Sequence, residues 1–243
     1  MSATQKPDRG KQMSGDSVLE LGVTAGNAFL LAFPSLFSII NPIGGAFIFD
    51  GVMREADHAQ RTKVAARVGL YAMLIMFGAL WVGAYVLNFF GVSIDALRIA
   101  GGLVVAASGW KLLSAGEQNP DRKGAAQRTA SGNVDDPLQL AFFPLTLPLT
   151  TGPGTIAVAI TLGSVRPAYG LGLIAFFIGV SLAAAANAAL IWIAYRYADR
   201  VTALIGATAR HVIVRLSAFL LMCIGVQIIV GGAGDIVGGW GGL

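Results

Sequence analysis

Two short segments place polar side chains, proline and glycine together inside long uncharged stretches. The first segment lies in the uncharged run 21–49 and contains Ser38, Asn41, Pro42, Gly44 and Gly45. The second segment contains Thr150, Thr151, Gly152, Pro153, Gly154 and Thr155. Proline lacks the N–H that an α-helix requires, and glycine tolerates non-helical backbone. The two segments therefore predict two interrupted membrane helices that face the protein interior rather than lipid.

A break in a membrane helix creates polar groups that can bind a ligand. It exposes backbone N–H groups, which favour a carboxylate, and carbonyl groups, which accept from an ammonium. Two opposed breaks would form a site for a small zwitterion. No charged residue or histidine falls near the centre of a predicted span, which favours a net-neutral substrate. For one proline alone, a helix kink used only for packing is the better explanation, but two breaks at matching positions favour a site.

The composition indicates an integral membrane protein. The 243 residues are 55% hydrophobic and 12% charged, whereas a soluble domain carries about 25% charged residues. Basic residues lie in short loops between the apolar runs, which argues against a nucleic-acid-binding face. The single cysteine, Cys223, excludes an intrachain disulfide and argues against a cysteine-based metal site.

Six membrane-spanning helices are predicted in one domain, residues 21–235. They fall within 21–49, 68–94, 99–113, 137–165, 168–195 and 216–234. Residues 1–20 are expected to be a disordered tail, 116–136 a flexible linker and 236–243 a C-terminal tail. A loop carrying Arg196, Arg200, Arg210 and Arg215 is expected before the sixth span. Asn187 and Gln227 lie within spans and are expected to form hydrogen bonds between helices.

The distribution of basic residues predicts the orientation in the membrane. The first, third and fifth loops with their flanks hold twelve Lys and Arg residues, whereas the tails and the other two loops hold five. Cytoplasmic loops carry the excess of basic residues. Both termini are therefore expected outside the cytoplasm.

The two halves of the domain resemble each other, which predicts an internal repeat. Leu97–Ala100 (LRIA) opens the third span and Val214–Ser217 (VRLS) opens the sixth, 117 residues later; Pro42 and Pro153 are 111 residues apart. Each half, 21–115 and 137–235, has three spans. Because three is odd, the second half would be inverted relative to the first. Inverted repeats with paired interrupted helices are typical of secondary transporters.

Four motifs carry a resemblance to a known family: NPIGGAFIF at 41–49, LRIAGGLVVAASGWKLL at 97–113, PLTTGPGTIA at 148–157 and RLSAFLLMCIGVQIIV at 215–230. The chain resembles the MarC family, which implies a six-span inner-membrane protein and, in SnatA-type members, transport of small neutral amino acids. The resemblance places the substrate site at Asn41, Pro42, Gly44, Thr151, Gly152, Pro153 and Gly154. Many relatives read NPxGN, with asparagine where this chain has Gly45.

We therefore expect a secondary transporter of small neutral amino acids such as glycine and alanine, held between the first and fourth helices. The alternatives are transport of another small neutral solute, or ligand binding without transport. The spans offer no nucleophile–base pair or metal set, so an enzyme is not expected. The chain has no GxxxxGK[ST] motif for ATP, so the energy would come from gradients. Coupling to Na⁺, coupling to H⁺ and facilitated diffusion all stay open. No cofactor is expected, and the oligomeric state and transport direction stay open.

Overall fold

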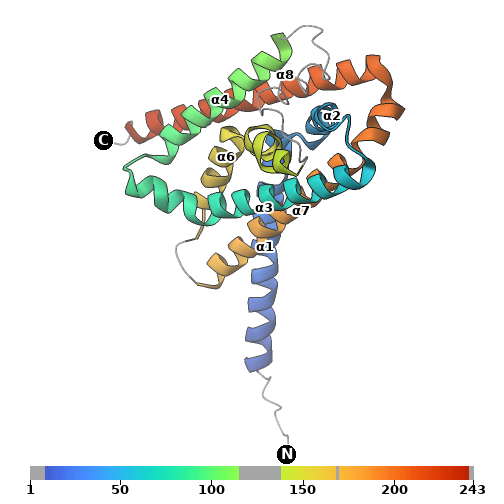
Figure 1. The fold of residues 1–243 in the computed structure, drawn as a ribbon. Helices are drawn as coiled ribbons and strands as arrows, with labels where there is room; N and C mark the ends of the chain where they lie inside the picture. Colours follow the sequence, from blue (N-terminus) through green and yellow to red (C-terminus); the bar gives the residue numbers. More distant parts are fainter. Residues whose placement is uncertain (1–8, 115–137, 168–169, 241–243) are drawn as a thin grey trace, which may run out of the picture.

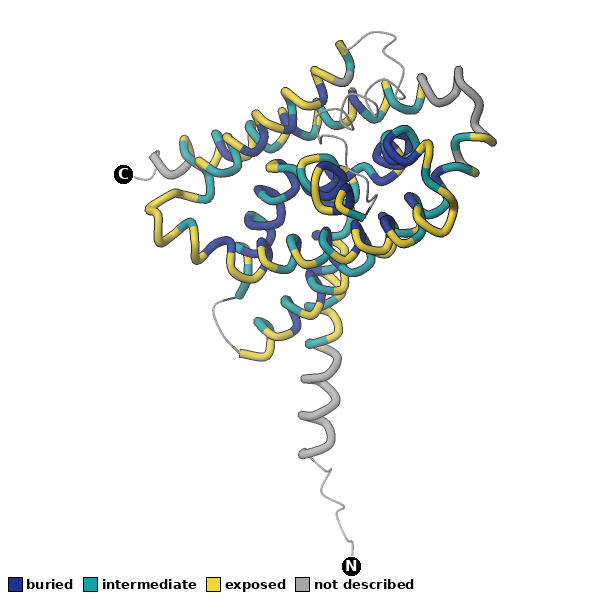
Figure 2. The backbone as a smooth tube through the Cα atoms, viewed as in Figure 1, coloured by how far each residue is buried: buried dark blue, intermediate teal, exposed yellow. Residues whose placement is uncertain are grey.

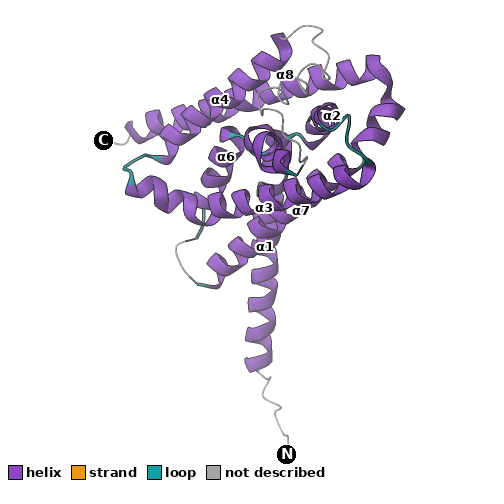
Figure 3. Cartoon of the chain, viewed as in Figure 1, coloured by secondary structure: helices purple, strands orange, loops and turns teal. Residues whose placement is uncertain are grey.

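The computed structural model describes residues 9–114, 138–167 and 170–240, and this part of the chain is helical without strands (Figure 3). The expected linker 116–136 lies outside the described residues. The helical elements, in chain order, are α1 (Arg9–Ile40), α2 (Pro42–Val52), α3 (His58–Phe89), α4 (Ile94–Ser114), η1 (Gln139–Ala141), η2 (Phe142–Thr150), α6 (Pro153–Ser164), α7 (Leu171–Arg196) and α8 (Ala198–Trp240) (Figure 1). The π-helical η2 has non-helical backbone at Phe143 and Leu147, and each of these residues precedes a cis-proline.

Four helical segments are long and apolar enough to cross a membrane: Glu20–Val52, His58–Phe89, Leu171–Arg196 and Val212–Val237. The pair Gln139–Thr150 and Pro153–Ser164, bent by 68°, forms a fifth candidate. Helix α4, where the third span was expected, is not among them. Its charges at Asp95, Arg98 and Lys111 leave a charge-free stretch shorter than a usual span. The described residues thus contain four or five candidate spans, and the expected six are not confirmed.

Helical structure extends further at both ends than the sequence indicated. Helix α1 begins at Arg9, within the stretch assigned to the N-terminal tail. Helix α8 runs without interruption from Ala198 to Trp240, so the predicted loop before the sixth span is wrong. That segment is rich in alanine and arginine, which are good helix formers, and its charges do not prevent a helix.

The segments on either side of each break pack against long helices from the other half of the chain. Helices α1 and α2 contact α7, and α2 also contacts α8. Segment η2 and helix α6 contact α3, and α6 also contacts α4. Figure 2 shows that buried backbone, in dark blue, is concentrated on α2 and on the bent η2–α6 pair. The breaks therefore lie in the interior of the bundle.

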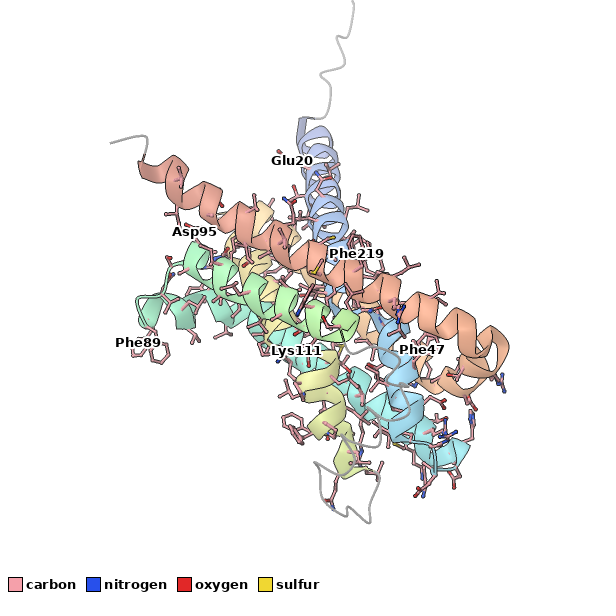
Figure 4. The ribbon with its side chains drawn as sticks, turned by 90° about the horizontal axis from the view of Figure 1, so that it is seen from above. Glu20, Phe47, Phe89, Asp95, Lys111 and Phe219 are labelled. Carbon is pink, nitrogen blue, oxygen red and sulfur yellow. The ribbon has the colours of Figure 1, made fainter. Side chains whose placement is uncertain are left out.

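Helices α4 and α8 lie side by side (Figures 1 and 4) and approach closely through glycine. A Cβ added at Gly102 would lie 2.7 Å from the Gly225 carbonyl oxygen, and one at Gly109 would lie 2.6 Å from the Met222 backbone nitrogen. Small residues let membrane helices approach until their backbones touch. We call Gly102, Gly109 and Gly225 the glycine seam.

Candidate functional site

The first break lies at Asn41, between α1 and α2. Asn41 has left-handed backbone angles, φ 47° and ψ 65°, which asparagine tolerates better than most residues. Its Oδ1 accepts a hydrogen bond of 3.1 Å from the Gly44 N–H and caps α2. Pro42, the first residue of α2, has no N–H to donate to the Ser38 carbonyl. The interruption predicted at this position is therefore present.

The second break lies at Thr151 and Gly152, between η2 and α6. Gly152 has an extended backbone, φ −72° and ψ 175°, and Pro153 is the first residue of α6. A Cβ at Gly152 would lie 2.9 Å from the Pro148 carbonyl oxygen. Because that oxygen belongs to the backbone, it cannot rotate away, and the position favours glycine for lack of space.

Three threonine hydroxyls near the second break donate to backbone carbonyls five residues earlier. Thr146 donates to Ala141 (2.6 Å), Thr150 to Leu145 (2.6 Å) and Thr151 to Thr146 (3.1 Å). A hydroxyl has one hydrogen and two lone pairs, so the single donor of each threonine is already used. These oxygens can still accept, which suits a ligand ammonium better than a carboxylate.

A tyrosine from α7 joins the two breaks. Tyr195 Oη lies 2.8 Å from Thr150 Oγ1. Because Thr150 already donates to Leu145, Tyr195 is the donor in this pair. A Cβ added at Gly45 would strike the Tyr195 hydroxyl, and the Tyr195 ring stacks on Phe49 with centroids 4.8 Å apart. Gly45 and Thr150, one from each predicted segment, thus meet at one buried side chain.

The other predicted residues are divided between the two breaks. Asn41, Pro42 and Gly44 form the first break itself, and Thr151, Gly152 and Pro153 form the second. Two further residues follow the second break on α6. Thr155 is buried there, and a Cβ at Gly154 would strike Val105 of α4. The structure brings Gly45 and Thr150 to Tyr195, while Ser38 lies elsewhere, in an adjoining cavity.

That cavity has a volume of about 440 Å³ and is bounded by α1, α6, α8 and one residue of α4. Its polar lining comes from Ser35, Ser38, Thr161, Gln227 and Arg98. The α1 residues that line it precede the first break, and the α6 residues follow the second. Tyr195 instead contacts residues after the first break and before the second. The cavity and Tyr195 therefore contact opposite halves of each broken helix.

Comparison with known proteins decides the family. The model of the MarC family integral membrane proteins matches residues 26–237. The chain belongs to the MarC family. It is 32% identical over 203 residues to the inner membrane protein MarC of Citrobacter koseri and 33% identical over 207 residues to that of Salmonella typhimurium. Each match covers 83% of this chain and 92% of the relative. No solved structure gives a significant match.

The structure gives a reason for the glycine that departs from the motif in this MarC-family chain. Position 45 is where the resemblance leads one to expect asparagine. A side chain at this position would meet the Tyr195 hydroxyl. Gly45 and Tyr195 therefore fit together as a pair.

Sequence reasoning missed Tyr195, the side chain that lies between the two breaks. The sequence shows Tyr195 as a tyrosine at the end of an apolar run. That pattern is equally typical of a tyrosine at the membrane interface, so it does not indicate a role at the breaks.

The prediction for Asn187 is confirmed, because its Nδ2 donates to the Phe33 carbonyl of α1 at 3.3 Å. Gln227, for which a similar bond was expected, is one of the residues that line the cavity.

Proposed function

We propose that this protein is a secondary transporter of small neutral amino acids such as glycine and alanine, bound between the broken first and fourth helices. The observation that carries the proposal is the meeting of the two breaks at Tyr195, through Gly45 and Thr150. Irregular backbone at membrane depth is tolerated where protein or a wet cavity surrounds it, and paired breaks of this kind hold substrates in secondary transporters.

The proposal includes six spans arranged as two inverted repeats, with α4 as the third span. The packing supports this arrangement, because the contacts that the half-helices make with α3 and α7, and that α2 and α6 make with α8 and α4, have counterparts in the other half, whereas the smaller α1–α8 and α7–α8 contacts have none of comparable extent. Helix α2 packs on α7 and α8, as α6 packs on α3 and α4. Helix α1 packs on α7, as η2 packs on α3. An exchange of the two halves leaves these paired contacts unchanged, as a twofold repeat requires.

The polar groups at the breaks match the two ends of a zwitterion. The Asn41 Oδ1 accepts from Gly44, and the Nδ2 of the same amide can donate to a carboxylate. The hydroxyl oxygens of Thr150 and Thr151 have used their hydrogens and can accept from an ammonium. The first break thus supplies a donor and the second supplies acceptors, which favours a substrate with one end of each kind.

The remaining parts of the proposal concern location and energy. The relatives are named inner membrane proteins, and we place this chain in that membrane with both termini outside the cytoplasm. An H⁺ or Na⁺ gradient would drive transport. The protein would act without a cofactor and would not be an enzyme.

The test is flux of labelled glycine and alanine into liposomes that contain the purified protein. The double variant Asn41→Ala, Thr151→Ala removes the amide donor and one hydroxyl acceptor, and its flux should fall at least about ten-fold. The matched control is Asn88→Ala, Thr62→Ala, which makes the same chemical changes on α3, and it should transport as the wild type does.

Three results would each contradict part of the proposal. Equal flux in the wild type and the Asn41, Thr151 double variant would remove the site from the two breaks. Ligand-dependent thermal stabilisation without flux would indicate binding without transport. Flux of other neutral solutes in the absence of glycine or alanine flux would change the substrate.

A further inference from the structure

We propose that the cavity beside the first break is a separate docking site for the zwitterion, in which Arg98 binds the carboxylate and Asp95 and Asp235 bind the ammonium. This inference deepens the proposed function and rests on it. We call the cavity together with these three charged residues the entry site.

The charges at the entry site match a zwitterion. Among the described residues that line the cavity, Arg98 is the one that carries a charge. Its Nη1 pairs with the Asp235 carboxylate and lies 3.7 Å from Asp95 Oδ1. A guanidinium binds a carboxylate strongly, and a carboxylate accepts from an ammonium. One cation beside two carboxylates therefore offers a partner for each end of an amino acid.

The charged groups are accessible to a solute. Their side chains are 26% exposed for Arg98, 35% for Asp95 and 56% for Asp235. Figure 4 shows Asp95 at one end of α4, with Lys111 toward the other end. Ion pairs between partly exposed groups contribute little net free energy, so a ligand can replace one partner at small cost.

The cavity extends from Arg98 to the α1 residues just before the first break. A volume of about 440 Å³ lies within the range of small-molecule sites, about 300–1,000 Å³. Ser38, which lines the cavity, is about one helical turn before Asn41. Tyr195 packs against the opposite halves of the broken helices. A solute that enters beside Arg98 thus reaches Ser38, about one turn before Asn41, without displacing Tyr195.

The competing explanation is that the Arg98–Asp235 pair only fastens α4 to α8. The two helices are already in contact along the glycine seam. A fastening role predicts that Arg98→Gln and Asp235→Asn lower thermal stability and leave ligand affinity unchanged. An entry site predicts that both variants weaken binding, since each removes a partner of one end of the ligand.

The experiment measures binding of labelled L-alanine to the full-length protein in lipid-free detergent, in the Asn41→Ala, Thr151→Ala background, so that the site at the breaks does not contribute to the measured affinity. Arg98→Gln should weaken the affinity about ten-fold or more, as expected for loss of a charge-assisted hydrogen bond. Arg215→Gln is the matched control, because it removes a cation from the corresponding position of the other half, and it should leave affinity unchanged. Asp235→Asn is the second variant if Arg98→Gln does not fold. Ethylamine and propionate, each with one charged end, should compete poorly.

Unchanged alanine affinity in both Arg98→Gln and Asp235→Asn would overturn the entry site. A lipid headgroup shares the zwitterionic chemistry, so the binding is repeated in nanodiscs of phosphatidylethanolamine and of phosphatidylglycerol, which has no ammonium. Alanine affinity should be the same in both; a loss confined to phosphatidylethanolamine would assign the site to lipid instead. If alanine binding depends on Arg98 but the wild-type protein shows no flux, the transporter proposal is contradicted and the entry site is not. If the wild-type protein transports alanine and Arg98→Gln leaves that flux unchanged, the entry site is contradicted and the transporter proposal is not.

Discussion

At the scale of single residues, the two breaks are stabilised in different ways. Asn41 combines a left-handed backbone with an amide that caps the following helix. The second break relies on Gly152, which fits beside the Pro148 carbonyl, and on threonine hydroxyls that satisfy carbonyls of η2. At the first break the Asn41 side chain replaces a backbone acceptor that the break removes, whereas at the second the Thr151 hydroxyl adds to the backbone N–H that the Thr146 carbonyl already accepts. The replacement at Asn41 matters more in lipid than in water, because lipid offers no partner.

The Tyr195 hydroxyl can be tested by removing one oxygen atom. Tyr195→Phe keeps the ring on Phe49 and loses the hydrogen bond to Thr150. Because Thr150 still donates to Leu145, we expect a loss of about 1 kcal/mol, which lowers the apparent Tm by about 2–4 °C. Thermal denaturation in detergent measures the shift. Tyr85→Phe, an exposed ring beneath Arg166, is the control and should leave Tm unchanged.

The pairing of Gly45 with Tyr195 predicts a non-additive double variant. Gly45→Ala places a methyl group against the Tyr195 hydroxyl and should cost about 1–3 kcal/mol. In Gly45→Ala, Tyr195→Phe the obstructing oxygen is absent, so the combined loss should be smaller than the sum of the two single losses. Gly78→Ala, which meets open space on α3, should be neutral or slightly stabilising. Additive losses in denaturation measurements would show that the two residues do not interact.

Residue type alone indicated the breaks but not the side chain between them. Pro42, Pro153 and the glycines beside them indicate a helix interruption from residue type alone. Proline lacks the N–H of a helix and glycine tolerates non-helical backbone, whatever the tertiary packing. The role of Tyr195 depends on how α7 packs against two segments far away in sequence. Neither its own type nor its neighbours encode that contact, so local reasoning could not find it.

At the scale of elements, the contact between α4 and α8 depends on the glycine seam. Gly109→Ala would place a methyl group 2.6 Å from the Met222 nitrogen and 2.8 Å from the Ala218 carbonyl oxygen. Backbone atoms cannot rotate away, so the helices must separate, at a cost of about 1–3 kcal/mol. Gly234→Ala, which meets open space on α8, is the control. A Gly109→Ala variant as stable as this control in thermal denaturation would contradict the close packing.

The sequence predicted most helices but not their extent or bend. The apolar runs 68–94 and 168–195 correspond to α3 and α7, since long apolar stretches in lipid must be helical. The 68° bend between η2 and α6 was not predictable, because proline and glycine permit a range of angles and packing selects one. The first break also contains proline and glycine, yet the helices on either side of it form one candidate span, Glu20–Val52, rather than a bent pair.

At the scale of the whole molecule, the proposed orientation is open to a direct test. Alkaline phosphatase fused after Leu243 should be active, and a green fluorescent protein fused there should be dark, because both termini are expected outside the cytoplasm. Insertions in the loop 116–136 should give the reverse result, since that loop is expected inside. A fluorescent C-terminal fusion would invert the assignment, and the Arg98 end of the cavity would then face the cytoplasm.

The glycine seam also limits how the protein can change shape. Where backbone lies on backbone, even a small slide of α4 along α8 would push each glycine against a neighbouring side chain. The two helices should therefore travel as one rigid unit, and any alternation of access must come from the four half-helices and from α3 and α7. Spin labels attached across α4 and α8 should keep one separation whether or not substrate is present, whereas labels across the breaks should report two.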